Sequence, residues 1–181
     1  MHGLVSLLDS QHYHLVEEIW RELERDCGLT GIQVTPFPHI SWKIAADYDF
    51  EALKGVVQEI AAETMPFTIT VNGLGIFTNE APVVYLSVVR TAPLSVLHAK
   101  IWARVLPIST DVSPYYAPEQ WMPHISLAYT DVTCENLPCV LEKIAFRPFS
   151  WQVGVDNIAF IHEPNGEIGE KWFEYNLGPK E

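Results

Sequence analysis

A four-residue motif that occurs twice constrains the fold of this chain more than any other feature. Residues 38–41 are Pro-His-Ile-Ser, and the same sequence returns at 123–126. After a helical pattern, each copy is followed by a second matching segment: Pro-Phe-Thr-Ile-Thr-Val at 66–71 and Pro-Phe-Ser-Trp-Gln-Val at 148–153. Two copies are too few for a solenoid, which needs at least about three stacked repeats. The duplication instead predicts two similar lobes that face each other across a pseudo-twofold axis.

The periodicity around both copies predicts an α+β fold, with antiparallel sheets and helices arranged around a central cleft. We expect one bilobal domain over residues 1–181, with an internal repeat of approximately 37–90 and 122–177. The predicted strands are 4–8, 67–71 and 83–89, the last two forming a hairpin, and the predicted helices are 10–27, 53–60, 93–105 and 137–144. The segment 107–123 contains four prolines and no clear periodicity, so we expect a loop there.

The composition is that of a folded protein with a strong negative charge. Hydrophobic residues make up 48% of the chain and charged residues 19%, which provides enough apolar surface to offset the entropy of folding. Eleven Lys and Arg stand against 23 Asp and Glu, a net charge of −12. This charge repels polyanions, so we expect neither duplex DNA nor a membrane surface as a partner. The N-terminal segment lacks the features of a signal peptide. We expect a cytoplasmic protein, and a monomer.

The cysteines do not have the pattern of a disulfide framework. There are three, Cys27, Cys134 and Cys139, which is an odd number, and none is in a Cys-x-x-Cys motif. We therefore expect free thiols in a reducing compartment.

Each copy of the repeated motif combines an imidazole with a hydroxyl. Residues two apart in a strand share a face, so His39 lies beside Ser41 and, in the second copy, His124 lies beside Ser126. One neutral imidazole can take a proton from the attacking hydroxyl or water, while the other, protonated, gives one to the leaving oxygen. The serines can donate hydrogen bonds to phosphate oxygens. The motif predicts acid–base cleavage of a phosphodiester, and leaves open which histidine is the base.

A purely structural role is the alternative, because buried histidines are often simply hydrogen-bonded to a nearby serine. The positions that flank the motif have diverged, with Phe37 in one copy and Met122 in the other. The histidine and the serine are identical in both copies, although packing alone does not require this. We therefore favour a functional site.

These features resemble the 2H phosphoesterases, and among them the bacterial 2′-5′ RNA ligases, also described as RNA 2′,3′-cyclic phosphodiesterases. The likeness covers most of the chain: an opening strand and helix, two His-x-Ser/Thr strands and a duplicated lobe architecture. It implies metal-independent hydrolysis, or reversible formation, of cyclic or 2′-5′ phosphodiester bonds, with no cofactor. It also implies that His39 and His124 are the catalytic residues, and that Ser41 and Ser126 bind the phosphate.

The chain departs from this family just after the second motif. RNA-ligase-like members often have a pattern like His-x-Thr-Leu-Ala-Arg, whereas this chain has His-Ile-Ser-Leu-Ala-Tyr, ending at Tyr129. A guanidinium can bind a phosphate through two hydrogen bonds and a phenol cannot. Together with the negative charge, this favours a small cyclic-phosphate nucleotide as the partner over a long RNA; an RNA terminus stays open. Tyr129 is either a substrate contact or a packing residue.

Further candidate substrate contacts lie near the motifs. Lys43 is two residues beyond Ser41, so we expect it on the same face, where it could balance a phosphate charge. Tyr115, Tyr116 and Trp121, in the proline-rich segment, could stack on a nucleobase.

We predict no metal site. The two motif histidines lack a third strong ligand, because serine is a poor one. His12 and His14 are two residues apart on a predicted helix, point about 200° apart and are expected on the surface.

The sequence leaves three functional classes open. The first is a phosphodiesterase, which we favour. The second is a non-catalytic module with the same fold that binds a nucleotide or an RNA end. The third is a scaffold whose histidines only stabilise it.

Overall fold

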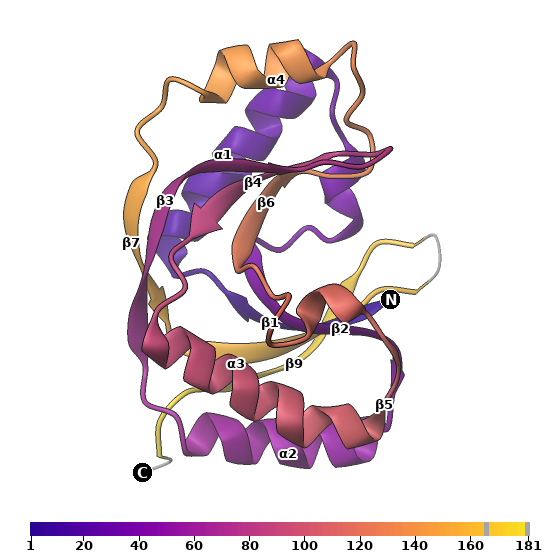
Figure 1. Ribbon diagram of the computed structural model, residues 1–181, viewed down its shortest axis with the longest axis vertical. Helices are drawn as coiled ribbons and strands as arrows, with labels where there is room; N and C mark the ends of the chain where they lie inside the picture. Colours follow the sequence, from indigo (N-terminus) through magenta and orange to yellow (C-terminus); the bar gives the residue numbers. More distant parts are fainter. Residues whose placement is uncertain (165–166, 180–181) are drawn as a thin grey trace.

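The computed structural model describes residues 1–164 and 167–179 and contains two antiparallel sheets with helices packed against them (Figure 1). Sheet A has the strand order β5-β2-β1-β8-β9, and sheet B has the order β6-β4-β3-β7. The strands are β1 (His2–Leu7), β2 (His39–Tyr48), β3 (Phe67–Phe77), β4 (Val83–Val88), β5 (Ser109–Val112), β6 (His124–Ala128), β7 (Ser150–Val155), β8 (Asn157–His162) and β9 (Glu170–Asn176). The helices are α1 (Ser10–Cys27), α2 (Phe50–Ala62), α3 (Ala92–Val105) and α4 (Leu137–Ile144). This confirms the predicted α+β fold.

The ends of α1 lie where capping residues predict them. Asp9 precedes the helix, and its carboxylate accepts a hydrogen bond from the backbone N–H of His12 at 3.1 Å. Gly28 ends it with φ of 72°, a left-handed conformation that glycine adopts without strain. The expectation that His12 lies on the surface is wrong: its ring is buried, with Nδ1 2.8 Å from the Asp9 carboxylate. The Asp9 carboxylate therefore both caps the helix and binds the His12 ring.

The two repeats meet in sheet B with a reciprocal register. Thr70 of β3 and Gln152 of β7 occupy equivalent places in the two matching segments, and they lie directly opposite each other. The Gln152 amide donates to the Thr70 hydroxyl at 3.1 Å. Two equivalent residues that face each other across an antiparallel pair are what a twofold axis between two copies produces. The axis predicted from the duplication thus passes close to this pair of residues.

The helices cross between the two halves. Helix α1 comes from the first half of the chain but packs against β6, and α3 comes from the second half but packs against β2. Strands β2 and β6, which carry the two motifs, contact each other where the sheets meet (Figure 1). This crossed packing brings the two copies of the motif to one place.

The segment 107–123 is not only a loop. It contains β5, which pairs with the second half of β2: Val112 lies opposite Ala45 and Thr110 lies opposite Asp47. The remaining residues include a 3-10 turn at Pro114–Tyr116. Strand β5 has only four residues and partly exposed side chains, so its sequence carried too little apolar periodicity to be recognised.

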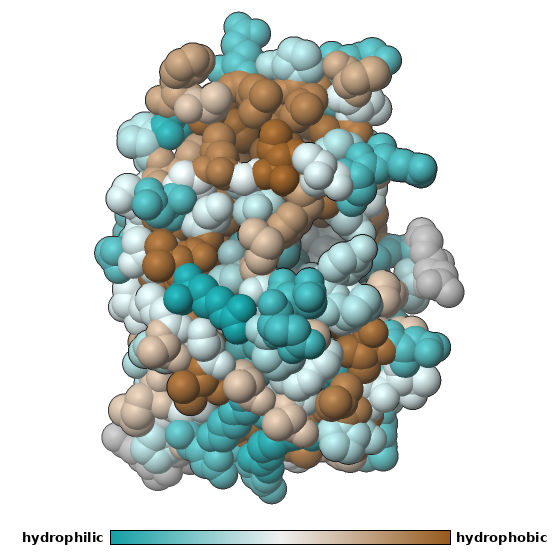
Figure 2. Space-filling model, in the orientation of Figure 1, coloured by the Kyte–Doolittle hydropathy of each residue, from teal (hydrophilic) through white to brown (hydrophobic). Residues whose placement is uncertain are grey.

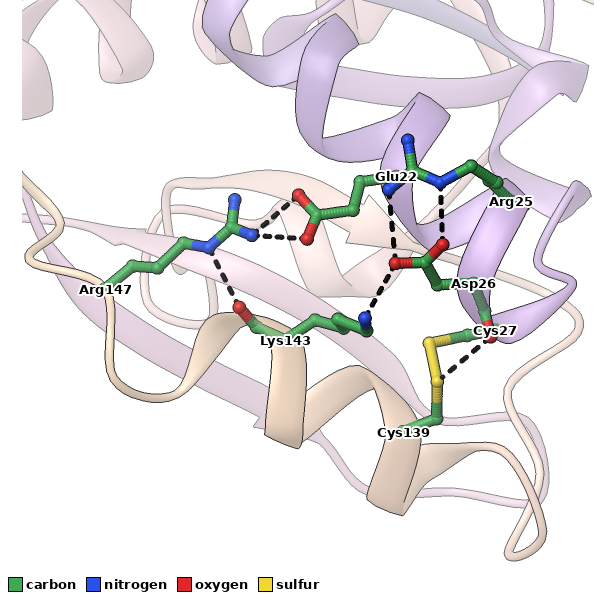
Figure 3. Close-up of polar contacts among 7 residues, drawn as sticks. All are labelled: Glu22, Arg25, Asp26, Cys27, Cys139, Lys143 and Arg147. Atoms are coloured by element: carbon green, nitrogen blue, oxygen red, sulfur yellow. Dashed lines mark hydrogen bonds and ion pairs between the residues drawn. A yellow bond between two sulfur atoms is a disulfide. The ribbon is translucent and has the colours of Figure 1, made fainter.

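The prediction of free thiols is wrong for two of the three cysteines. Cys27, the last residue of α1, forms a disulfide with Cys139 of α4, and the two Cα atoms are 5.8 Å apart (Figure 3). Two ion pairs lie beside it: Lys143 of α4 is 2.7 Å from Asp26 of α1, and Arg147, three residues beyond α4, is 2.6 Å from Glu22 of α1. Cys134 is exposed and free. The disulfide escaped prediction because spacing in the sequence does not show that two helix ends meet.

The surface is uneven in polarity. Figure 2 shows apolar residues gathered over the upper end of this face, near α4 and sheet B, and more hydrophilic residues over α2 and α3. Among the residues that the structure describes, no helix combines the length and apolarity required for crossing a bilayer.

Candidate active site

Each motif begins with a proline that fixes the start of its strand. The Pro38 carbonyl accepts a hydrogen bond from the backbone N–H of Leu8 at 3.1 Å, and the Pro123 carbonyl accepts one from Val88 at 3.2 Å. Leu8 follows β1 and Val88 ends β4, the neighbouring strands in the two sheets. Proline suits these positions because it has a fixed φ and the residue before it favours an extended conformation. Both motifs therefore enter their strands in the same way.

The two imidazoles are oriented by the same local contact. His39 Nδ1 hydrogen-bonds the carbonyl of Phe37, and His124 Nδ1 lies 2.7 Å from the carbonyl of Met122. A carbonyl can only accept, so Nδ1 carries the proton in each ring. In the neutral imidazole, Nε2 is then the free acceptor. Each histidine thus has its Nε2 available for proton transfer.

Burial favours the neutral form of both rings. Burial, with a smaller contribution from the charge of His124, lowers the pKa of His39 to about 4, against the opposing effect of the bond to the Phe37 carbonyl. Burial also lowers the pKa of His124, against the bond to the Met122 carbonyl. The two rings lie on β2 and β6, the motif strands that contact each other. No Lys or Arg contributes to either shift among the described residues.

The motif serines lie on the same face as the histidines. Ser41 and Ser126 are half-buried, whereas Ile40 and Ile125 between them and the histidines are fully buried in the core. This is the predicted alternation of strand faces. The structure therefore brings together His39, Ser41, His124 and Ser126, all four of the residues at the centre of the prediction.

The three candidate tyrosines lie in different environments. The Ser41 side chain lies beside the Tyr116 phenol, whose pKa burial raises to about 12. The charge of Tyr129 also raises the pKa of Tyr116. Burial and the charge of Glu163 raise the pKa of Tyr129. Tyr115 is 77% exposed. Tyr116 and Tyr129 thus extend the site beyond Ser41, and Tyr115 is directed to solvent.

Two aromatic residues that the sequence analysis missed flank His124. The centroid of the Phe77 ring is 4.9 Å from that of His124, and the centroid of Tyr85 is 5.2 Å from it. The two aromatic rings also stack on each other, 4.2 Å apart. They come from β3 and β4, the predicted hairpin. The alternation of residues in each segment indicates a strand, but it does not show that β6, with His124, lies beside β4.

The expectation that Lys43 shares a face with Ser41 is wrong. The register of β1 against β2 shifts between Leu4 and Val5, which lie opposite Lys43 and Ser41, so Trp42 is an extra residue in a bulge. The bulge turns Lys43 into the core, where it is 0% exposed. Its ammonium lies 4.5 Å from the centre of the Trp102 ring and has no hydrogen-bond partner, and burial lowers its pKa to about 8. Lys43 is therefore unavailable to a phosphate in the cleft.

Replacing Lys43 with methionine tests this placement. We expect Lys43→Met to raise the free energy of unfolding by about 1 kcal/mol, because it removes a buried ammonium that lacks a hydrogen bond and keeps the chain length. Urea unfolding measures the stability, and we expect turnover to change less than about threefold. A large loss of substrate affinity would contradict the buried position.

Trp121 does not present a ring face for a nucleobase. It is 2% exposed, and it stacks on His98 with ring centroids 3.8 Å apart and planes 6° apart. The guanidinium of Arg90 lies near its ring, 5.6 Å from the centroid. Its indole N–H donates to the carbonyl of Ser41 at 3.0 Å. The stacking prediction for Trp121 is therefore wrong, because both faces of its ring are covered.

An open hollow of about 520 Å³ lies at the end of β6. It is bordered by Tyr129 and Thr130, which follow the strand, and by the turn between β3 and β4. Within residues 1–164 and 167–179, His, Cys, Asp and Glu side chains form no group of three or more that could hold a metal ion.

Comparison with solved structures supports the fold. TT0787 of Thermus thermophilus superposes with a TM-score of 0.67 and 16% sequence identity, and the match covers 99% of each chain. E. coli LigT complexed with 3′-AMP superposes with a TM-score of 0.62 and 13% identity, covering 98% of this chain and 97% of that one.

Two bacterial proteins, each named "putative phosphoesterase", are similar in sequence. The one from Bacillus cytotoxicus is 25% identical over 144 residues, which are 78% of this chain and 79% of that protein. The one from Oceanobacillus iheyensis is also 25% identical over 144 residues and covers 80% of that protein's length.

A family model matches the region of the chain that carries both motifs. The model describes the 2′-5′ RNA ligase superfamily, and it matches residues 10–167. The matched region contains both His-x-Ser strands and extends over far more than half of the chain. The chain therefore belongs to the 2′-5′ RNA ligase superfamily, within the 2H phosphoesterases.

Proposed function

We propose that this protein hydrolyses cyclic or 2′-5′ phosphodiester bonds of nucleotides or RNA ends by two-histidine acid–base catalysis. The observation that carries the proposal is the matched pair of imidazoles, each bound through Nδ1 to a backbone carbonyl and each leaving Nε2 free. The paired serine hydroxyls lie on the same face. Similarity to phosphoesterases supports the reaction class.

In the proposed mechanism the phosphate lies between the two motifs. Ser41 and Ser126 donate hydrogen bonds to its non-bridging oxygens, where negative charge grows in the transition state. Nε2 of one histidine takes a proton from water as the water oxygen bonds to phosphorus. Nε2 of the other gives its proton to the ribose oxygen as the bond from phosphorus to that oxygen breaks. The product is a phosphomonoester, and proton exchange with solvent restores both rings.

The donor set supports a reaction without a metal. Two imidazoles and two hydroxyls offer only two strong ligands, whereas zinc sites use three or four. The charge that develops on the phosphate is instead met by hydrogen bonds and by the protonated imidazole.

The nucleoside is proposed to lie towards Tyr129. This residue is three positions beyond Ser126, roughly 10 Å along an extended chain, and it borders the open hollow. We expect Tyr129→Ala to raise the KM for a cyclic nucleotide by about tenfold, the loss expected for one stacked ring, with Tyr115→Ala as a control that changes little. Equal KM values for the two variants would contradict this placement.

The pH dependence of kcat/KM should follow the lowered histidine pKa values. One imidazole must be neutral and the other protonated, so the rate is highest between the two pKa values of the free enzyme. The pKa of His39 is about 4, and that of His124 is below its ordinary value. Rising pH deprotonates the histidine that acts as the acid. We therefore expect kcat/KM to decline already below pH about 6.5, the ordinary histidine pKa.

The pH profile of kcat provides an internal comparison. A bound phosphodiester anion favours the protonated imidazole, so the alkaline limb of kcat should lie at higher pH than that of kcat/KM. A kcat/KM profile that is flat from about pH 5 to about pH 8 would contradict the assignment of two titrating histidines.

A panel of substrates tests the reaction class. It contains nucleoside 2′,3′-cyclic phosphates, an ADP-ribose cyclic phosphate and a 2′-5′ dinucleotide, and products are identified by chromatography. We expect a phosphomonoester from at least one member. If the folded protein binds these compounds but converts none, it is a nucleotide-binding module on the same fold. If it neither binds nor converts any, the histidines only stabilise the structure.

A further inference from the structure

Two buried tryptophans make the same contact with the two motif serines. The indole N–H of Trp20, on α1, donates to the carbonyl of Ser126 at 3.1 Å. The indole N–H of Trp121, just before β6, donates to the carbonyl of Ser41 at 3.0 Å. Each tryptophan comes from one half of the chain and binds the motif strand of the other half. The contacts are therefore matched, although the internal repeat does not align the two tryptophans.

The position of the motif strands explains why these carbonyls need a donor. Strand β6 is at the edge of sheet B. In β2, the neighbour β5 pairs only with Ala45 to Tyr48, so the motif residues have β1 on one side and no strand on the other. A strand edge leaves alternate carbonyls without a partner in the sheet. The two indoles supply this missing donor at both motifs.

Both indoles are buried, and further contacts hold Trp121 in place. Trp20 is 4% exposed and Trp121 is 2% exposed. Trp121 stacks on His98, whose Nε2 lies 3.1 Å from the carbonyl of Tyr116. The Arg90 guanidinium donates to the carbonyl of Trp121 itself at 3.1 Å. The ring and its backbone are thus fixed separately, so that the N–H has little freedom to turn away from Ser41.

We propose that Trp20 and Trp121 are a matched pair of positioning residues. Each indole fixes the backbone of one motif serine, and so fixes the direction of its hydroxyl. Neither side chain contacts the substrate. This proposal rests on the proposed function, because the hydroxyls that it orients are those assigned to bind the phosphodiester.

Phenylalanine variants remove the indole N–H and keep an aromatic ring. We expect Trp20→Phe and Trp121→Phe each to lower kcat by about 10- to 100-fold, because a small misplacement of reacting groups has large effects on rate. We expect KM to change less than about threefold. The control is Trp151→Phe: Trp151 also packs against the core, but it lies on β7, at the edge of sheet B opposite β6, where its ring centroid is 5.4 Å from that of His12.

The control separates positioning from general stability. All three variants should lose stability, which thermal unfolding measures, and all assays are made well below the unfolding temperature. We expect Trp151→Phe to keep kcat within about threefold of the unchanged protein. A loss of kcat in Trp151→Phe as large as in the other two would overturn the proposal, because it would show a general effect of a weakened core.

Double-mutant cycles test the specific pairing. If Trp121 acts through Ser41, then Trp121→Phe should have less than about a twofold effect on kcat in a Ser41→Ala background. The crossed combination, Trp20→Phe with Ser41→Ala, should instead show effects that multiply. The same pattern is expected for Trp20 with Ser126. Effects that multiply within both matched pairs would overturn the proposal.

The cycles remain informative if the proposed reaction fails. Should the unchanged protein bind nucleotides without turnover, the same cycles are measured on the Kd for adenosine 2′-monophosphate. Coupling of Trp121 with Ser41 in that affinity supports the positioning role, and independent effects overturn it. The lack of turnover is seen separately, in the substrate panel.

Discussion

Replacing His39 or His124 by alanine is expected to lower kcat/KM for a cyclic phosphodiester by about 10²- to 10⁴-fold, the range for loss of a general acid or base. The reason is geometric: each ring is held through Nδ1 by a backbone carbonyl two residues earlier, which leaves Nε2 for proton transfer. The two residues act as one unit, so the double variant should be little worse than either single one. Steady-state kinetics of the three variants measure this.

Two controls keep this prediction specific. His14→Ala removes an imidazole whose side chain is 70% exposed on α1, and it should leave kcat/KM unchanged. His39→Asn keeps an amide that can still donate to the Phe37 carbonyl, so it tests the loss of Nε2 with the local bond intact. Either alanine variant retaining full activity while folded would contradict the mechanism.

Loss of the Cys27–Cys139 disulfide is expected to lower the free energy of unfolding by about 2–4 kcal/mol. The two cysteines are 112 residues apart, so the bond closes a long loop in the unfolded chain and restricts it strongly. Urea unfolding of the oxidised protein, the reduced protein and the Cys27→Ala/Cys139→Ala variant measures the difference. The reduced protein and the variant should agree.

Two ion pairs still hold α1 against α4 and the residues that follow it when the disulfide is absent. They are Lys143–Asp26 and Arg147–Glu22 (Figure 3), so we expect the reduced protein to fold at room temperature. Cys134→Ser is the control and should not change stability, since Cys134 is exposed and free. Equal urea midpoints for oxidised and reduced protein would contradict the cross-link.

Local patterns predicted most of the helices and the first hairpin. Asp9 and Gly28 bracket α1 as caps do, and Pro93 lies in the first turn of α3. These signals depend on neighbours in the sequence, so they are visible without the fold. The repeated motif also predicts a functional site, because the same His and Ser pair occurs twice in surroundings that have diverged.

What the sequence could not predict depends on contacts between distant segments. Lys43 follows the strand alternation in sequence, but a bulge at Trp42, set by pairing with β1, reverses its face. The disulfide depends on where the ends of α1 and α4 meet. The aromatic character of Trp121 and its position near the motif favour a contact with the substrate, whereas packing on His98 buries the ring. In each case the tertiary neighbour decides the role of the side chain.

The most direct test of two-histidine catalysis is a time course of nucleoside 2′,3′-cyclic phosphate turnover in excess EDTA, followed by ³¹P NMR. The unchanged protein is compared with the His39→Ala/His124→Ala variant at equal concentration. We expect the cyclic diester signal to be replaced by that of a single phosphomonoester with the unchanged protein alone. Conversion at the same rate by the double variant, or conversion that EDTA abolishes, would contradict it.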